Sequence, residues 1–276
     1  MTAFQHGRWS KTLQEDPMFG AIAGDIIGSV YERTPMKRKD FPLFHPQGRF
    51  TDDSVLTLAV AHALLEDGDY RRWVWEYAHR YPDAGYGASF IHWLQTDGGK
   101  PYNSWGNGSA MRVSAVGYVF DTPERVLQEA AACAGITHNH PEGIKGAQAV
   151  ALAVYLARQG ASKAALREEI SRRFGYRLNR SLDAIRPMYR FDVSCQGSVP
   201  EAIIAFLDAS DYEDAVRNAV SLGGDSDTQA CMAGAIAEAF YGPLSSDIEL
   251  EAKRYLTEDL FEVASAFCDR FVVSRA

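Results

Sequence analysis

Two short clusters of oxygen-bearing side chains lie far apart in the sequence, and each combines a threonine with paired aspartates. Their members are Thr51, Asp52 and Asp53 in the first cluster, and Asp225, Asp227 and Thr228 in the second. Carboxylate and hydroxyl oxygens are the ligands that Mg²⁺ and Mn²⁺ prefer. If the fold brings the clusters together, they supply enough oxygens for two cations about 3.5–4 Å apart, a geometry used in metal-assisted hydrolysis. The sequence therefore indicates an enzyme with a metal centre.

Helix capping is the alternative interpretation of either cluster alone. Each cluster precedes an apolar, alanine-rich run that predicts a helix, and serine, threonine and aspartate are the usual residues at helix N-termini. The two interpretations are compatible, because a helix N-terminus favours ionised carboxylates. The repetition of the pattern favours metal binding. So does Gly223-Gly224, where the missing side chains would leave space for a ligand.

Two further carboxylates are candidates for acid–base chemistry. Asp25 and Glu32 are seven positions apart, so a continuous helix would place both on one face. A carboxylate beside a reacting water can act as general base, which is the role we expect for Glu32; the alternative is a solvated glutamate at a helix end. Asp25 has apolar or glycine neighbours, and it needs polar partners if it is buried.

A glycine-spaced loop leads into a predicted helix and has the sequence Asn103-Ser104-Trp105-Gly106-Asn107-Gly108. Backbone N–H groups in such a turn can bind phosphate oxygens. Trp105 offers a stacking face for a purine, and the Asn107 amide offers both a donor and an acceptor. Tyr86-Gly87 begins a weaker instance of the same pattern. We expect this region to contact a nucleotide.

Two histidines and a cysteine elsewhere have side chains that can bind or react. His138 is a candidate hydrogen-bonding group near the substrate, whereas His140 precedes a proline and is expected to shape the turn. No third ligand stands at the spacing of a zinc site. Cys195 has no evident partner that would activate it as a thiol nucleophile.

Composition excludes several classes of protein. The chain has 276 residues, 46% hydrophobic and 23% charged, which is enough for a sizeable core. Its net charge of −8 argues against bulk binding of nucleic acid, which needs a basic face. Four scattered cysteines form no C-x-x-C pair, as expected of reduced thiols in the cytoplasm. The first apolar stretch, residues 18–30, contains Asp25 and is too short to span a membrane, so no membrane association is expected.

Apolar residues at three- and four-residue spacing predict an all-α protein, because no sustained alternation of period two indicates a strand. The expected helices cover residues 19–31, 54–65, 70–80, 123–134, 144–157, 164–174, 200–207, 212–222, 228–240 and 248–271. Small residues in 20–24 and 230–237 predict close contact between helices. Residues 33–50, 81–87, 97–108 and 179–199 are expected to be irregular. No linker or repeat divides the chain, so we expect one domain over residues 18–276, preceded by an N-terminal extension of residues 1–17.

Five segments, in this order, resemble the ADP-ribosylglycohydrolase family, which includes dinitrogenase-reductase-activating glycohydrolases and ADP-ribosyl-acceptor hydrolases. The segments are Gly20-Ala21-Ile22-Ala23-Gly24-Asp25 with Tyr31-Glu32, Phe50-Thr51-Asp52-Asp53, Gly106-Asn107-Gly108-Ser109-Ala110-Met111-Arg112, Thr137-His138, and Gly223-Gly224-Asp225-Ser226-Asp227-Thr228. Each motif is modest alone, and their order makes the resemblance specific. It runs over residues 18–242.

The resemblance implies a single all-α domain with a dinuclear Mg²⁺ or Mn²⁺ centre in a central cleft. The family's metal ligands correspond to Thr51, Asp52, Asp53, Asp225, Asp227 and Thr228. Its mobile catalytic glutamate corresponds to Glu32, which we also expect to be a metal ligand, with Asp25 and Asp53 as further catalytic candidates. The part that holds diphosphate and adenosine corresponds to Tyr102, Asn103, Ser104, Trp105, Gly106, Asn107 and Gly108. Further expected substrate contacts are Asp52, Tyr86, Gly87 and His138.

The implied reaction is hydrolysis of the glycosidic bond between ADP-ribose and an acceptor, with arginine of a modified protein favoured and ADP-ribose as product. Such cleavage passes through an oxocarbenium-like state at ribose C1, and an acidic pocket stabilises the positive charge that develops there. Two alternatives stay open. One is another ADP-ribosylated acceptor, such as serine, a small metabolite or a nucleic-acid base. The other is a non-catalytic member that binds ADP-ribose, against which the complete ligand set and Glu32 count.

Overall fold

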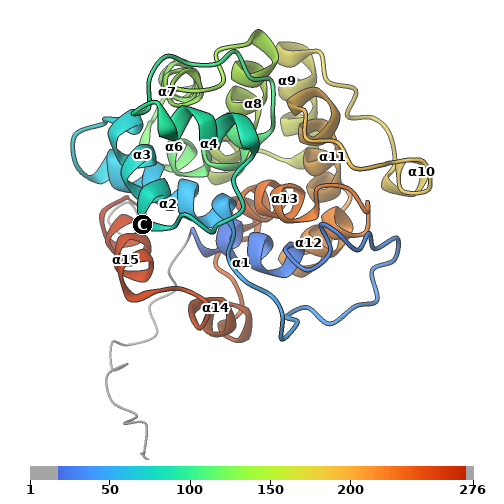
Figure 1. Cartoon of the computed structure of the whole chain (residues 1–276). Coiled ribbons are helices and arrows are strands. Elements are labelled where there is room, and N and C mark those ends of the chain that lie inside the picture. Colours follow the sequence, from blue (N-terminus) through green and yellow to red (C-terminus); the bar gives the residue numbers. More distant parts are fainter. Residues whose placement is uncertain (1–17, 272–276) are drawn as a thin grey trace, which may run out of the picture.

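The computed structural model describes residues 18–271, and these residues fold into fifteen helices without a strand (Figure 1). The all-α prediction is therefore confirmed for this part of the chain, whereas the predicted N-terminal extension lies outside it. The helices are α1 Phe19–Gly28, α2 Asp52–Leu65, α3 Tyr70–Arg80, α4 Ala88–Gln95, α5 Gly108–Met111, α6 Ser114–Val119, α7 Pro123–Gly135, α8 Pro141–Arg158, α9 Lys163–Phe174, α10 Leu182–Ile185, α11 Cys195–Leu207, α12 Tyr212–Val220, α13 Ser226–Tyr241, α14 Ser246–Lys253 and α15 Glu258–Phe271.

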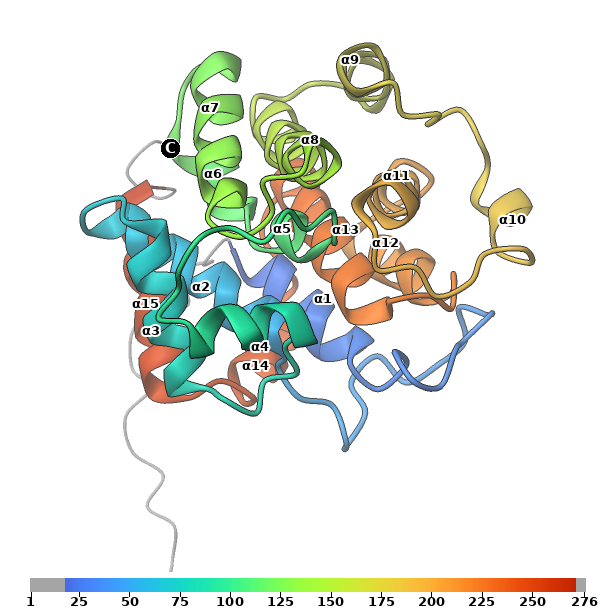
Figure 2. The ribbon, with the colours of Figure 1, turned by 45° about the horizontal axis from the view of Figure 1, so that its top comes forward.

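Helices α1 and α13 lie side by side in the middle of the molecule (Figure 2). Glycines recur every four residues along the face of α1 that meets α13. A Cβ atom added at Gly24 would lie 2.2 Å from the carbonyl oxygen of Ala230, and one at Gly28 would lie 2.4 Å from that of Ser226. The two backbones can approach this closely only because these positions carry no side chain. The expected contact between the helices rich in small residues is confirmed, and it places Asp25 next to the beginning of α13.

Helix α13 is the centre of the core. Its side chains are buried from Ser226 to Glu238, and α2, α5, α8, α11 and α12 pack around it together with α1. A helix that is buried on all sides must direct any polar group at its end toward a partner or a ligand. The carboxylates at the beginning of α13 are such groups.

Several boundaries differ from the sequence-based expectation, and helices α4 and α6 have no predicted counterpart. The helix expected over residues 248–271 is two helices, α14 and α15, separated by residues 254–257. The apolar spacing continues across this break, so the sequence pattern does not reveal it. Helix α11 begins at Cys195, five residues before the expected start at Pro200. Residues 179–199 contain the short helix α10.

No helix among residues 18–271 is both long enough and apolar enough to cross a membrane. The four cysteines are all buried and none forms a disulfide.

Candidate functional site

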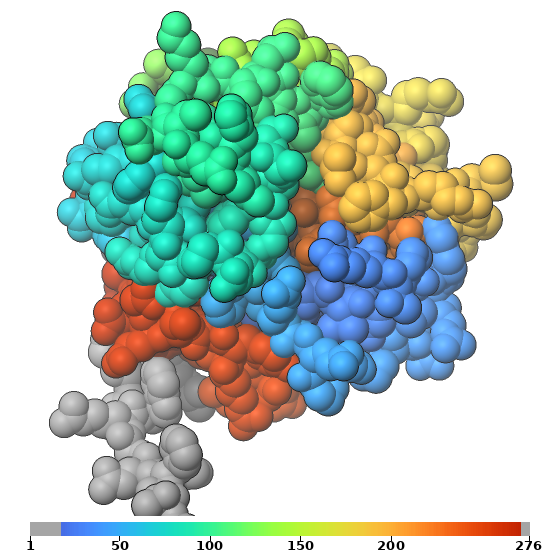
Figure 3. Space-filling view, viewed as in Figure 1, coloured from blue at the N-terminus to red at the C-terminus, as the bar shows by residue number. Residues whose placement is uncertain are grey.

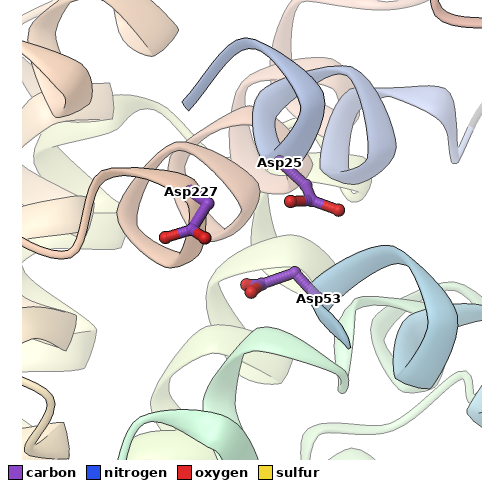
Figure 4. A group of neighbouring side chains, drawn as sticks. All are labelled: Asp25, Asp53 and Asp227. Atoms are coloured by element: carbon purple, nitrogen blue, oxygen red, sulfur yellow. The ribbon is translucent and has the colours of Figure 1, made fainter. Parts of the chain in front are cut away.

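Carboxylates from three helices converge at one point of the core. Figure 4 shows Asp25 on α1, Asp53 on α2 and Asp227 on α13 pointing toward one another. One carboxylate oxygen from each lies within 4.8 Å of the others, and Glu32, Asp225 and Asp227 form a second group of the same kind. Asp227 belongs to both groups. The two clusters that the sequence separates by more than a hundred residues therefore meet, as predicted.

A hollow on the molecular surface lies over this region. In Figure 3 it opens between the teal segment around α4, the gold segment that precedes α11 and the blue segment that follows α1, with orange atoms of the α12–α13 region at its base. The irregular stretches predicted over residues 33–50, 81–87 and 179–199 thus surround the site that the helices carry.

Asp25 holds the beginning of α2 in place. Its Oδ2 accepts hydrogen bonds from the backbone N–H groups of Thr51 at 2.8 Å and Ser54 at 3.0 Å, and its Oδ1 accepts one from the Thr51 hydroxyl at 2.6 Å. These are the partners that a fully buried carboxylate needs. The prediction that Asp25 and Glu32 share a helix face is wrong, because α1 ends at Gly28. Glu32 instead reaches the site from the following turn.

Helix capping explains one cluster but not the other. Thr51 is the N-cap of α2, and its hydroxyl accepts a hydrogen bond from the N–H of Asp53 at 3.3 Å. Asp225 occupies the same position before α13, yet its side chain caps nothing. Its Oδ2 accepts a hydrogen bond from the Asn107 side-chain amide at 2.7 Å instead. The Asp225 carboxylate therefore faces the site rather than its own helix.

The convergence of carboxylates raises their pKa values. Burial is the main cause for Asp53 and Asp227, whose pKa values lie well above the ordinary range, and neighbouring aspartates add to it. Burial, followed by the charge of Asp25, raises the pKa of Asp52 to about 7. Burial also raises the pKa of Asp225 to about 6, although the hydrogen bond from Asn107 opposes this.

These features fit a divalent cation. Asp53 Oδ1 is buried and has no hydrogen-bond partner, a state that costs free energy unless a ligand compensates it. The donor set consists of carboxylate and hydroxyl oxygens, which suits hard cations rather than zinc. The acidic residues at the beginnings of α2 and α13 can therefore bind metal.

The space beside Gly223 and Gly224 is filled by protein, so the expectation that it admits a ligand is wrong. A Cβ atom at Gly223 would lie 2.9 Å from Cε of Lys37, and one at Gly224 would lie 2.4 Å from Cε1 of Tyr189. Lys37 donates hydrogen bonds to the carbonyl oxygens of three residues, which are Arg186, Tyr189 and Leu222. Neither Lys37 nor Tyr189 can be predicted as a site residue from the sequence, because no local pattern records contacts between such distant segments.

The glycine-spaced loop is held against the segment that precedes α11. The N–H of Asn107 donates to the carbonyl of Val193 at 2.7 Å, and the N–H of Cys195 donates to the carbonyl of Trp105 at 2.8 Å. The N–H of Gly106 donates to the Ser104 hydroxyl at 3.1 Å. Together with the N–H of Asn103, which donates to the Asn139 side chain, three of the loop's backbone N–H groups are already hydrogen-bonded, so fewer of them can bind a phosphate. The Trp105 side chain is half exposed.

The other expected substrate contacts lie at two places. Asp52 is near Tyr86, whose buried hydroxyl has no hydrogen-bond partner, and the space beside Gly87 is open. Tyr102 and His138 pack together with ring centroids 5.7 Å apart. Asn103 adopts a left-handed backbone conformation, with φ of 54°, and its N–H donates to the side chain of Asn139.

Two further expectations concern residues outside the candidate site. His140 is the N-cap of α8 and accepts a hydrogen bond from the N–H of Glu142, so its turn-shaping role is confirmed. Cys195 is buried against the carbonyl of Gly106, and burial raises the pKa of its thiol to about 12. A thiol in this state is a poor nucleophile, as expected from the absence of an activating partner.

Comparisons with known proteins agree with this arrangement. The family model described as ADP-ribosylglycohydrolase matches residues 17–275. The human protein named ADP-ribosylhydrolase ARH3 is 29% identical, over 81% of this chain and 84% of its own length. ADP-ribosylarginine hydrolase Tri1 of Pseudomonas putida is 24% identical, over 92% of this chain and 77% of its own length.

Among solved structures, one titled as an ADP-ribosylglycohydrolase-related protein complex superimposes with a TM-score of 0.70 and 26% sequence identity. The superposition covers 91% of this chain and 95% of the other. A family match over nearly the whole chain, joined with this fold and this acidic site, leads to one conclusion: the chain belongs to the ADP-ribosylglycohydrolase family of enzymes.

Proposed function

We propose that this protein hydrolyses the glycosidic bond between ADP-ribose and a modified arginine side chain of a protein. The observation that carries the proposal is the meeting of the two oxygen-rich clusters at the beginnings of α2 and α13 in a member of this family. Two arguments support arginine as acceptor. The relative Tri1 is named for that linkage, and an acidic cleft attracts a cationic guanidinium more than a neutral acceptor.

We also propose that two Mg²⁺ or Mn²⁺ ions bind at the site. The residues that would hold them are Thr51, Asp52, Asp53, Asp225, Asp227, Thr228 and Glu32, which belongs to the second acidic group. Bound cations would supply Lewis-acid assistance and orient the substrate for hydrolysis. The unpartnered Asp53 Oδ1 and the raised pKa values support this assignment, because cations compensate the charge that burial otherwise penalises.

The protein's own residues divide the remaining work. Glu32 lies beside Asp225 and Asp227 and is the group that accepts a proton from the attacking water. The negative charge of the cleft stabilises the developing oxocarbenium at ribose C1. Trp105 stacks on the adenine from the half-exposed side of the glycine-spaced loop, and Tyr86 offers its unpaired hydroxyl near Asp52. The reduced cysteines support action in the cytoplasm.

The test is a panel of substrates with ADP-ribose attached to arginine, serine, cysteine or a nucleic-acid end. Release of ADP-ribose is measured with Mg²⁺, with Mn²⁺ and in chelator, for the wild type and for Asp227→Asn. Asp247→Asn is the matched control, because Asp247 is exposed at the beginning of α14. We expect metal-dependent release of ADP-ribose from the arginine substrate by the wild type and by Asp247→Asn. Asp227→Asn should abolish this release. Binding of ADP-ribose without release from any substrate would favour the non-catalytic alternative.

A further inference from the structure

Arg112 is a buried cation for which the proposed reaction has so far given no role. Its side chain is completely buried directly after α5, and no carboxylate among residues 18–271 forms a salt bridge with it. Nη2 donates to the carbonyl of Cys133 at 3.0 Å and to the Thr137 hydroxyl at 2.8 Å, while Nε and Nη1 have no partner. Burial of an arginine in this state is costly. If Arg112 only filled space in the core, an apolar side chain of similar size would stabilise the fold more.

The hydroxyl of Thr137 connects Arg112 to a histidine. Thr137 Oγ1 lies 2.7 Å from Nδ1 of His138. A guanidinium only donates hydrogen bonds, so the Thr137 hydroxyl accepts from Arg112. Its one proton can then be donated to Nδ1 of the imidazole, or its second lone pair can accept from an Nδ1–H group, and the tautomer of His138 decides between the two. When Nδ1 accepts a hydrogen bond, the proton of the neutral ring resides on Nε2.

The other ring nitrogen faces the glycine-spaced loop. A Cβ atom added at Gly108 would lie 3.3 Å from Nε2 of His138, and one added at Gly106 would lie 3.5 Å from it. The ring is held from behind by Tyr102. Burial, and secondarily the charge of Arg112, lowers the pKa of His138 well below its ordinary value, so the ring is neutral. In the tautomer in which Nδ1 accepts from Thr137, an Nε2–H group is directed at the loop that we expect to bind the nucleotide.

We propose that Arg112 is a positioning residue: through Thr137 it fixes His138 as the Nε2–H tautomer, which donates a hydrogen bond to an oxygen of bound ADP-ribose. This inference rests on the proposed function for the identity of the ligand. The backbone N–H groups of Gly106 and Asn107 are already hydrogen-bonded within the protein and are not free to bind a ligand oxygen. The Nε2–H group of His138 supplies a hydrogen-bond donor in their place. The competing view gives Arg112 and Thr137 a purely structural role.

The test reads the tautomer directly. ¹⁵N-labelled histidine is observed by NMR in the free protein, and ADP-ribose affinity is measured by calorimetry, for the wild type, Thr137→Val, Thr137→Ser and Arg112→Met. Valine matches threonine in shape but removes the hydroxyl, whereas serine keeps it. We expect the Nε2–H tautomer in the wild type and in Thr137→Ser, and its loss in Thr137→Val and Arg112→Met. Affinity for ADP-ribose should fall about ten- to hundredfold wherever the tautomer is lost.

Steady-state kinetics add a second readout, because the lost hydrogen bond should raise KM more than it lowers kcat. An Nδ1–H tautomer in the wild type would overturn the inference, as would a Thr137→Val protein with wild-type tautomer and affinity. Should Arg112→Met fail to fold, Thr137→Val and the wild-type spectrum still decide the question. If the Thr137 variants change the tautomer of His138 but the protein hydrolyses no ADP-ribosylated substrate, the proposed reaction is rejected. The positioning role of Arg112 and Thr137 is then retained.

Discussion

The hydroxyl of Thr228 donates a hydrogen bond to Asp53 Oδ2 at 3.1 Å, and it joins two residues that are 175 positions apart. Each residue lies in the first turn of its helix, so two helix N-termini point at the same group of carboxylates. The positive ends of two helix dipoles favour negative charge there. Burial nevertheless outweighs this effect, because the pKa values of these aspartates are raised. The metal-free protein therefore folds against an electrostatic penalty.

The first prediction concerns pH and metal. Because the pKa values of Asp52 and Asp225 are about 7 and about 6 in the folded protein, above their ordinary value of 3.8, the folded state holds protons more tightly than the unfolded state. This contribution to stability is complete below pH 3.8 and is lost as the pH rises through about 6 and 7. We expect the melting temperature in chelator to fall across this window, and saturating Mn²⁺ to remove the fall.

Asp227→Asn tests the same point by mutation. Removing one negative charge reduces the repulsion among the clustered carboxylates, so the metal-free variant should have a higher melting temperature than the wild type. The increase should be about 2–4 °C for each kcal/mol gained in the free energy of unfolding. Its Mn²⁺ affinity should drop. Asp247→Asn, at an exposed position, should change neither quantity. Calorimetric titration that finds undiminished Mn²⁺ binding in Asp227→Asn would contradict the assignment of this ligand.

The second prediction concerns the contact between α1 and α13. Gly24→Ala would place a methyl group 2.2 Å from the carbonyl oxygen of Ala230, and backbone cannot move aside as a flexible side chain can. Overpacking of this kind costs about 1–3 kcal/mol or more. Because α1 carries Asp25, which holds the beginning of α2, Mn²⁺ binding should weaken as well. Denaturant unfolding and titration measure the two effects.

Gly135→Ala is the matched control for that substitution. Gly135 ends α7, and an added Cβ would have no neighbour within 4 Å. Alanine in a helix is favoured over glycine by about 0.5–1 kcal/mol, so this variant should be as stable as the wild type or more so. Equal stability of the Gly24→Ala and Gly135→Ala variants would mean that α1 and α13 do not pack as closely as described.

Local signals in the sequence predicted the scaffold and much of the site. The Thr51 cap, the apolar spacing of α2 and α13, and the glycines of α1 are properties of neighbouring residues, so they can be read without the fold. The contact of Lys37 with Leu222 joins residues 185 positions apart. Nothing in either segment identifies its partner, and Gly223 therefore appeared to offer space for a ligand when it offers space for a lysine.

The third prediction follows from that lysine. Lys37 is the side chain that ties the segment after Glu32 to the carbonyl groups of Arg186, Tyr189 and Leu222. Lys37→Met keeps the length of the side chain but removes three hydrogen bonds, so Glu32 should be positioned less well. We expect kcat to fall about tenfold, which corresponds to an increase of about 1.4 kcal/mol in the activation free energy. The affinity for Mn²⁺ should stay nearly unchanged. The exposed neighbour Arg38 provides the control, as Arg38→Met; equal rates in both variants would refute the role of Lys37.

The fourth prediction concerns nucleotide recognition. Trp105 is half exposed, and its ring meets His140 edge-on with centroids 5.4 Å apart, so truncation should leave the fold intact. Stacking of a base on an aromatic ring is worth about 1–3 kcal/mol. Trp105→Ala should therefore weaken ADP-ribose about five- to hundredfold without changing metal affinity, whereas Trp105→Phe should keep most of the affinity. If calorimetry gives the alanine variant the wild-type affinity, adenine does not stack on Trp105.

The fifth prediction concerns catalysis by Glu32. Its carboxylate lies within 4.8 Å of those of Asp225 and Asp227, and the turn that carries it follows the end of α1 at Gly28. General acid–base assistance contributes about 10²–10⁴-fold to a rate, so Glu32→Gln should lose about that factor in kcat. Glutamine keeps the size and one oxygen of glutamate, so the affinity for substrate should change far less.

Single-turnover rates on ADP-ribosyl-arginine at saturating Mg²⁺ separate this role from that of a solvated helix-end residue. Such rates exclude product release, which can hide a slower chemical step. Glu66→Gln, at an exposed position where α2 ends, controls for the loss of one negative charge. If Glu32 is only a solvated helix-end residue, Glu32→Gln should change the single-turnover rate as little as Glu66→Gln does. A change below about threefold, less than the weakest general-base effect expected, would rule out proton transfer by Glu32 and direct attention to the carboxylates of Asp52 and Asp53.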